Sequence, residues 1–124
     1  MQNSEFMYSP FHSWAHYIED QIVLIGITEY AADSLGEVVY VGLPLVGDSV
    51  TSGMVMGEIE SSKAFSDLYS PVDGIVIEVN DIFEEYPEIV NSDPYVKGWM
   101  IKVELSSIVP EDLMTKDQYL ELNE

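Results

Sequence analysis

The sequence predicts one mainly β domain, a small sandwich or barrel of antiparallel strands. Short runs of β-branched and alternating apolar residues recur along most of the chain, and Gly, Pro and Asp separate them. The length of 124 residues suits a single domain, residues 1–124, with one modest core. Residues 1–10 are polar and are expected to be a loose N-terminal segment, whereas residues 110–123 are expected to be helical.

The first strands precede a short helix. Residues 21–27 are rich in β-branched side chains and follow a turn-like pair of acids, which predicts the second arm of a hairpin. Residues 29–35 are predicted to be helical, because Thr28 can cap the first turn and Gly36 can end the last one.

Several strands are expected in the middle of the chain. A sharp bend at residues 61–63 lies between two apolar strand patterns. Asp73-Gly74 is a favourable hairpin pair, and it begins the next strand pattern. The strands predicted here cover residues 37–43, 54–61, 63–71 and 73–80, with a strand of two or three residues within 46–53.

The end of the chain changes from strand to helix. Residues 98–105 alternate apolar and other residues, so one face of this strand should be buried. Two prolines limit the preceding segment to a brief helix near residues 87–90. Pro110 can start a helix, and Thr115 with Gln118 matches a capping box, so one or two short C-terminal helices are predicted.

The composition excludes several classes of ligand and site. The chain has 23 acidic residues against 4 lysines, and its formal net charge is −19. Nucleic acid and anionic membranes would be repelled, whereas basic patches on partner proteins would be attracted. The lack of cysteine excludes disulfides and thiolate catalysis and fits a reducing compartment. The chain begins with no signal-like segment and has no apolar stretch near the ~18 residues of a membrane span, so we expect a cytoplasmic protein.

The usual catalytic patterns are weak in this sequence. His12 and His16 are four residues apart and would share a face only on a helix, which Pro10 and the strand pattern after Trp14 argue against. No two carboxylates stand out as an acid and base pair, and no glycine-rich phosphate loop is present. The residues therefore indicate neither a catalytic nor a metal site.

Lys63 is the only Lys or Arg in the first 96 residues. The apolar strand patterns on both sides of its bend would direct the ammonium group into water. Its neighbours Ser61, Ser62 and Ala64 are small, so another protein could approach the side chain closely. An exposed lysine stays protonated at neutral pH and is a poor nucleophile, but it is a good attachment point. The acids expected around it are Glu58, Glu60 and Asp67.

The residues around Lys63 belong to a longer pattern. Residues 60–64, "ESSKA", are followed by Ser66-Asp67 and then by "SPVDG" at 70–74. This segment resembles the lipoylation segment of the glycine cleavage H-protein family. The resemblance covers roughly residues 7–120, and its other parts are His12-x-Trp14, the spacing from Gly26 to Gly53, "EVN" at 78–80, "NSDPY" at 91–95 and "GWMIKV" at 98–103.

The resemblance implies a fold and an attached cofactor. The fold would be a barrel-sandwich hybrid of antiparallel sheets, as in lipoyl domains. Lipoate would be covalently attached to Lys63, and the enzyme that attaches it would recognise the surrounding segment. The residues expected in that recognition are Glu60, Ser61, Ser62, Ala64 and Asp67.

The resemblance also implies a carrier rather than an enzyme. A pyridoxal-phosphate-dependent glycine decarboxylase would load an aminomethyl group onto the lipoyl arm. A tetrahydrofolate-dependent aminomethyltransferase would unload it, and dihydrolipoyl dehydrogenase would reoxidise the arm. A lipoate ligase or a lipoyl or octanoyl transferase would attach the arm.

Two positions depart from the family pattern. Ser13 stands where Glu is common, and Ser34 stands where His often precedes Leu35-Gly36. The family's glutamate is implicated in holding the loaded arm in a surface cleft, so these changes would weaken that cleft, although Asp67 remains as a partner. An alternative is therefore an H-like protein that relays lipoyl groups to 2-oxoacid dehydrogenases or serves another lipoyl-dependent pathway. A third reading is a biotin carrier or an unmodified acidic interaction domain, but a biotin carrier would have Met on both sides of the lysine.

Overall fold

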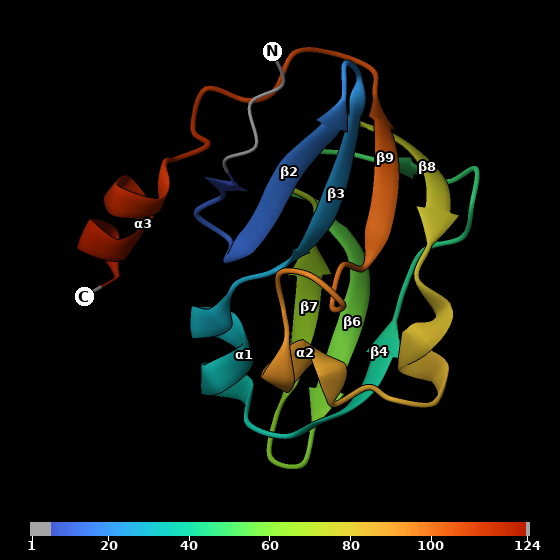
Figure 1. The fold of residues 1–124 in the computed structure, drawn as a ribbon, viewed down its shortest axis with the longest axis vertical. Helices are drawn as coiled ribbons and strands as arrows, with labels where there is room; N and C mark the ends of the chain where they lie inside the picture. Colours follow the sequence, from blue (N-terminus) through green and yellow to red (C-terminus); the bar gives the residue numbers. More distant parts are fainter. Residues whose placement is uncertain (1–5, 124) are drawn as a thin grey trace.

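The computed structural model describes residues 6–123, which fold into two antiparallel sheets. Figure 1 shows the larger sheet above the smaller one, with β6 and β7 ending in a turn at the edge of the molecule. The mainly β fold predicted from the sequence is confirmed. The larger sheet consists, in spatial order, of β1 (Met7–Tyr8), β2 (Ser13–Glu19), β3 (Ile22–Ile27), β9 (Ile101–Leu105), β8 (Gly74–Val79) and β5 (Ser49–Val50). The smaller sheet consists of β4 (Val38–Gly42), β6 (Val55–Ser61) and β7 (Phe65–Tyr69).

Short helices connect and flank the sheets. They are α1 (Glu29–Leu35), the 3-10 helix η1 (Asp81–Glu84), α2 (Ile89–Ser92) and α3 (Lys116–Leu122). Figure 1 shows α1 and α2 near the smaller sheet, and α3 at the side of the molecule beyond β2. No helix in residues 6–123 is both long and apolar enough to span a membrane.

Two clusters of buried residues form most of the core. The first fills the larger sheet, and the second joins the smaller sheet to α1, η1 and α2. The alternation in residues 98–105 is confirmed, because Ile101, Val103 and Leu105 are buried in the first cluster. Met100 is also fully buried, in the second cluster. The chain at the start of β9, where Met100 precedes Ile101, therefore connects the two parts of the core.

The predicted capping residues act as expected. The hydroxyl of Thr28 accepts a hydrogen bond from the backbone N–H of Ala31 at the start of α1. Gly36 ends the helix with a φ of 79°, a conformation that favours glycine. Thr115 and Gln118 form both hydrogen bonds of the capping box at the start of α3.

The prediction of a loose segment over residues 1–10 is wrong where the structure describes it, from residue 6 onward. Tyr8 pairs with Met114 through two backbone hydrogen bonds of 2.7 and 2.8 Å. Phe6 packs edge-on against Trp14, and Tyr8 is buried against Tyr119. The apolar rings of an otherwise polar segment supply enough buried area to order it.

The prediction of a hairpin at Asp73-Gly74 is also wrong. β7 lies in the smaller sheet and β8 in the larger one, so this pair connects two sheets. Gly74 is required there for another reason, since a Cβ at this position would collide with the backbone of Glu104 and with the side chain of Val103. Sequence patterns do not reveal such a close approach between distant strands.

The helical predictions after β8 are correct in kind and displaced in position. The brief helix expected at 87–90 is α2, which begins two residues later, at Ile89. The helix η1 was not predicted, although Asn80 caps it by accepting a hydrogen bond from Ile82. Pro110 does not start a helix, and the C-terminal segment contains one helix, α3, that begins at Lys116.

Candidate functional site

Ser61 ends β6, and its buried hydroxyl organises the turn that follows. The hydroxyl oxygen accepts hydrogen bonds from the backbone N–H groups of Ala64 (2.9 Å) and Lys63 (3.3 Å). The backbone N–H of Ser61 donates to the carbonyl of Ala64 (2.8 Å), and that of Ser62 donates to the carbonyl of Glu37 beside β4 (2.9 Å). The turn is therefore tied both to itself and to the neighbouring strand.

Lys63 lies at the tip of this turn with its side chain exposed. Its Cε lies 3.0 Å from where a Cβ would stand on Gly36, at the end of α1. Within residues 6–123, the ion pair that the structure shows is Lys102 with Glu78 at 2.8 Å, and Lys63 forms none. The lysine stem thus rests against the bare backbone of Gly36, while the ammonium group stays accessible.

The acids predicted around Lys63 lie on the adjoining strands. Glu58 faces Asp67 across the β6–β7 ladder, and Glu60 faces Phe65. The structure does not bring any of these carboxylates within 4.0 Å of the lysine nitrogen. They give the hairpin a negative surface without holding the lysine in an ion pair.

The residues expected in recognition of the segment differ in exposure. Glu60, Ser62, Ala64 and Asp67 are exposed and accessible to another protein. Ser61 is only 6% exposed, so its hydroxyl serves the turn rather than an external contact.

An apolar cavity of about 580 Å³ lies beside the same hairpin. Its walls include Phe11, Ile27, Leu35 and Ile59, which come from the segment before β2, from β3, from α1 and from β6. β7 forms another wall, and at ~3.3 Å per residue its Asp67 lies roughly 10 Å along the strand from the turn. The cavity is therefore within reach of a long group attached at the turn.

The structure brings three predicted polar positions together in this cavity. Ser13, Ser34 and Asp67 all line it, although they are far apart in the sequence. Ser13 is 1% exposed, and its hydroxyl is 2.8 Å from that of Ser9. Among the described lining residues, Asp67 is the one acidic side chain, so it supplies the negative charge of the cavity.

His12 forms part of the cavity wall in an unusual backbone conformation. Its φ is 68°, in the left-handed region that residues with a side chain seldom adopt. The ring stacks on Tyr30, with the ring centroids 4.8 Å apart, and Nδ1 lies 2.6 Å from the hydroxyl of Tyr119. Burial lowers the pKa of His12, which favours the neutral imidazole.

The second histidine lies elsewhere. His16 is on β2 and stacks on Phe6 with ring centroids 4.3 Å apart. His12 therefore lies in the bend before β2 and His16 within the strand, so the pair is not on a helix, as expected. In the part of the chain that the structure describes, no three His, Asp or Glu side chains gather as metal ligands.

Sequence reasoning missed two features of this site. The contact of Lys63 with Gly36 joins residues that no local pattern relates, although Gly36 itself was expected to end the helix. The bond between His12 and Tyr119 spans 107 positions and has no sequence signal. Both depend on how α1 and α3 pack against the sheets.

Comparisons with known proteins agree with this geometry. Residues 6–124 match the family model described as glycine cleavage H-protein. A glycine cleavage system H protein of Streptomyces avermitilis is 48% identical over 96% of this chain and 94% of its own length. One from Staphylococcus epidermidis is 46% identical over the same two shares.

A solved structure agrees with the sequence relatives. The crystal structure of a glycine cleavage system H protein from Mycobacterium marinum superimposes with a TM-score of 0.89 at 36% identity, covering 98% of both chains. Agreement over nearly the whole length in both sequence and fold leaves no large part of the chain unaccounted for. The chain belongs to the glycine cleavage H-protein family.

Proposed function

We propose that Lys63 is the residue of this chain that carries lipoate, bound through an amide to Nζ. As a glycine cleavage H protein, the chain is the lipoyl carrier of glycine cleavage. The observation that carries the assignment to Lys63 is an exposed lysine on a turn that hydrogen bonds make rigid, with no ion pair to any described residue. A modifying enzyme can reach such an amine without unfolding the chain.

Attachment at this turn separates a fixed root from a mobile arm. The bonds of Ser61 to the turn hold the backbone of Lys63 in place. Amide formation removes the lysine charge and adds a long flexible chain. When bound, the lipoyl group supplies the dithiolane chemistry, and the protein supplies delivery of that group to several active sites.

The apolar cavity is the proposed resting place of the arm. A volume of about 580 Å³ with apolar walls suits the hydrocarbon part of a lipoyl arm. Asp67, at the cavity, would accept hydrogen bonds from an amine carried at the end of the arm. With Ser13 bonded to Ser9 and Ser34 exposed, Asp67 takes a larger share of this role than the family pattern implies.

The proposed partners are the enzymes of glycine cleavage and an attaching enzyme. They are glycine decarboxylase, aminomethyltransferase and dihydrolipoyl dehydrogenase, with a lipoate ligase or a lipoyl or octanoyl transferase. The net charge of −19 and the acids beside the turn favour basic docking faces on these enzymes. The relatives are named for glycine cleavage, so a relay of lipoyl groups to 2-oxoacid dehydrogenases is not favoured.

Reconstitution tests this function directly. Lipoylated protein should support exchange of bicarbonate into glycine by glycine decarboxylase, because the carrier accepts the aminomethyl group that remains after CO2 is released. The Lys63→Arg variant, treated with the same lipoate ligase, should support no exchange above the rate without carrier. Equal exchange with Lys63→Arg would refute the assignment.

A further inference from the structure

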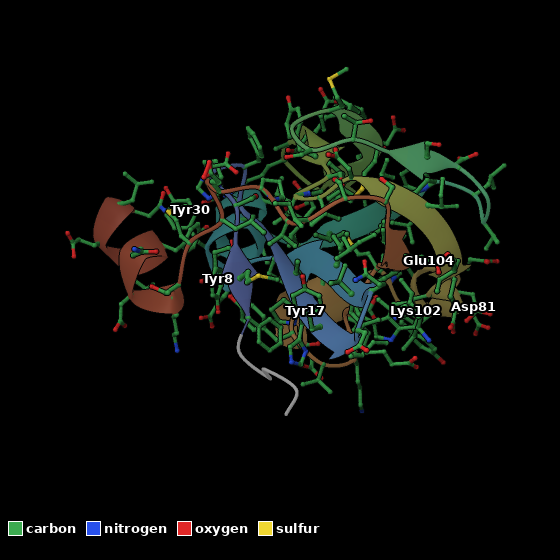
Figure 2. All side chains as sticks on the ribbon, turned by 90° about the horizontal axis from the view of Figure 1, so that it is seen from above. Tyr8, Tyr17, Tyr30, Asp81, Lys102 and Glu104 are labelled. Carbon is green, nitrogen blue, oxygen red and sulfur yellow. The ribbon has the colours of Figure 1, made fainter. Side chains whose placement is uncertain are left out.

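Helix α3 buries one side chain against the rest of the described structure. Tyr119 is 2% exposed, whereas the other residues of α3 are exposed. Its ring stacks on Tyr8 with the centroids 5.1 Å apart. Figure 2 shows Tyr8 and Tyr30 on the side of the molecule that carries α3. The helix therefore brings a single aromatic hydroxyl close to the apolar cavity proposed as the resting place of the arm, which we call the arm cavity.

The hydroxyl of Tyr119 joins two structures that shape the cavity. It lies 2.9 Å from Oγ1 of Thr28 and 2.6 Å from Nδ1 of His12. Thr28 is fully buried and caps α1 by accepting from the N–H of Ala31. One hydroxyl thus links α3 to the cap of α1 and to the cavity wall.

The hydrogen bonds that join Thr28, Tyr119 and His12 favour one assignment of donors and acceptors. Among the described residues, the acceptor near the Thr28 hydroxyl is Tyr119. If Thr28 donates to Tyr119, the Tyr119 proton is free to donate to Nδ1 of His12. A neutral His12 then carries its own proton on Nε2. Every hydroxyl proton is used in this arrangement, and the lowered pKa of His12 agrees with a neutral ring.

The His12 ring needs such a bond to hold its position. Its backbone is in the left-handed region, and the ring has an open cavity on one side. Stacking on Tyr30 fixes the plane of the ring, but Tyr30 is itself 46% exposed. The bond to Tyr119 fixes which ring nitrogen faces the interior, so the other edge remains for the cavity.

We propose that Tyr119 is a positioning residue for the arm cavity, and that its hydroxyl holds His12 as a fixed neutral wall beside the loaded arm. This inference rests on the proposed resting place of the arm. The proposed role of Tyr119 gives α3 a part in sheltering the aminomethyl group on the arm (the cargo) from water. A neutral ring also adds no positive charge beside an arm that ends in an amine.

The test measures how fast water releases the cargo when no transferase is present. Lipoylated protein is loaded with glycine and glycine decarboxylase and is then purified. In the release step the C–S bond of the aminomethyl group breaks and water adds, giving formaldehyde, ammonia and the free dithiol. The variants are Tyr119→Phe and, as the matched control, Tyr17→Phe on β2, whose hydroxyl forms no hydrogen bond with a described residue. The same loaded protein in guanidinium chloride gives the unsheltered rate.

Tyr119→Phe should release formaldehyde about three- to tenfold faster than wild type, the range expected for one hydrogen bond, and Tyr17→Phe should match wild type. Equal rates for wild type and Tyr119→Phe, both below the unsheltered rate, would overturn the positioning role and leave the resting place intact. A wild-type rate equal to the unsheltered rate would overturn both.

A spectroscopic measurement on the unmodified protein tests the network without the arm. The ¹⁵N shifts of His12 at neutral pH should show the proton on Nε2 in wild type and a mixture of tautomers in Tyr119→Phe. A proton on Nδ1 in wild type would overturn the proposed direction of the bond. This readout does not depend on whether the variant can be loaded.

Discussion

Replacing Ser61 by alanine should loosen the turn that presents Lys63, while replacing its neighbour Ser62 should not. The Ser61 hydroxyl accepts one good hydrogen bond, from Ala64 at 2.9 Å, and one long bond, from Lys63 at 3.3 Å. The hydroxyl also donates one long bond, of 3.3 Å, to the carbonyl of Ala64. A net hydrogen bond contributes about 0.5–1.5 kcal/mol, so removing one good and two long bonds should cost about 1–2 kcal/mol. Ser62 is exposed, and its hydrogen bond to the carbonyl of Glu37 uses its backbone N–H, which Ser62→Ala keeps.

Two assays measure this difference. Denaturant unfolding should give Ser61→Ala a lower free energy of unfolding by about 1–2 kcal/mol, with Ser62→Ala within about 0.5 kcal/mol of wild type. Lipoylation by a lipoate ligase should show a lower kcat/KM for Ser61→Ala only, because the lysine is presented by a less ordered turn. If Ser61→Ala matched Ser62→Ala in both assays, the turn would not depend on the buried hydroxyl and the reasoning would be wrong.

Three further predictions concern the glycine beside Lys63, the aromatic cluster and the charge. Gly36→Ala puts a Cβ on a backbone with a φ of 79°, so unfolding experiments should show a loss of about 1–3 kcal/mol, and no loss would contradict this backbone strain, since the flexible Lys63 stem can move away from the new Cβ. Burial, with a smaller effect of Tyr95, raises the pKa of Tyr8 to about 12 from 10.0, so its contribution to stability is complete below pH 10 and is lost as the pH rises toward 12. Tyr8→Phe should therefore lose less stability than wild type between pH 9 and pH 12, and equal losses would count against this cause. Binding to glycine decarboxylase should weaken as salt rises from about 0.05 to 0.5 M, and an affinity independent of salt would reject an electrostatic contribution from the net charge of −19.

The local parts of the fold could be predicted because their causes are local. The helix over 29–35 depends on a cap at Thr28 and on Gly36, and both signals lie within the segment. The buried face of β9 follows from alternation within five residues. The turn at Lys63 is signalled by small polar residues between two apolar strand patterns.

The errors came from contacts between distant segments. Asp73-Gly74 has the composition of a hairpin, but β8 pairs with β5 and β9 in the other sheet. Tyr8 belongs to a polar segment, but its pairing with Met114 and its stacking on Tyr119 order that segment. No local pattern encodes either choice.

In the candidate site, too, the feature with a local signal could be predicted, and the features built by distant segments could not. Lys63 stands out in the sequence because it lacks other cations near it, whereas the cavity is assembled from Ser13, Ser34 and Asp67 on three separate elements. The family resemblance pointed to Ser13 and Ser34, and the fold brings them to one cavity. The bond between His12 and Tyr119 has no counterpart in the sequence pattern and required the structure.

The intact mass of this protein, purified from its own host, tests the central claim most directly. A lipoyl-sized mass addition should be present on the wild-type chain, map to the peptide that contains Lys63, and be absent from Lys63→Arg expressed in the same host. An unmodified wild-type chain, or an adduct that persists in Lys63→Arg, would contradict the assignment of this exposed lysine as the root of the carrier arm.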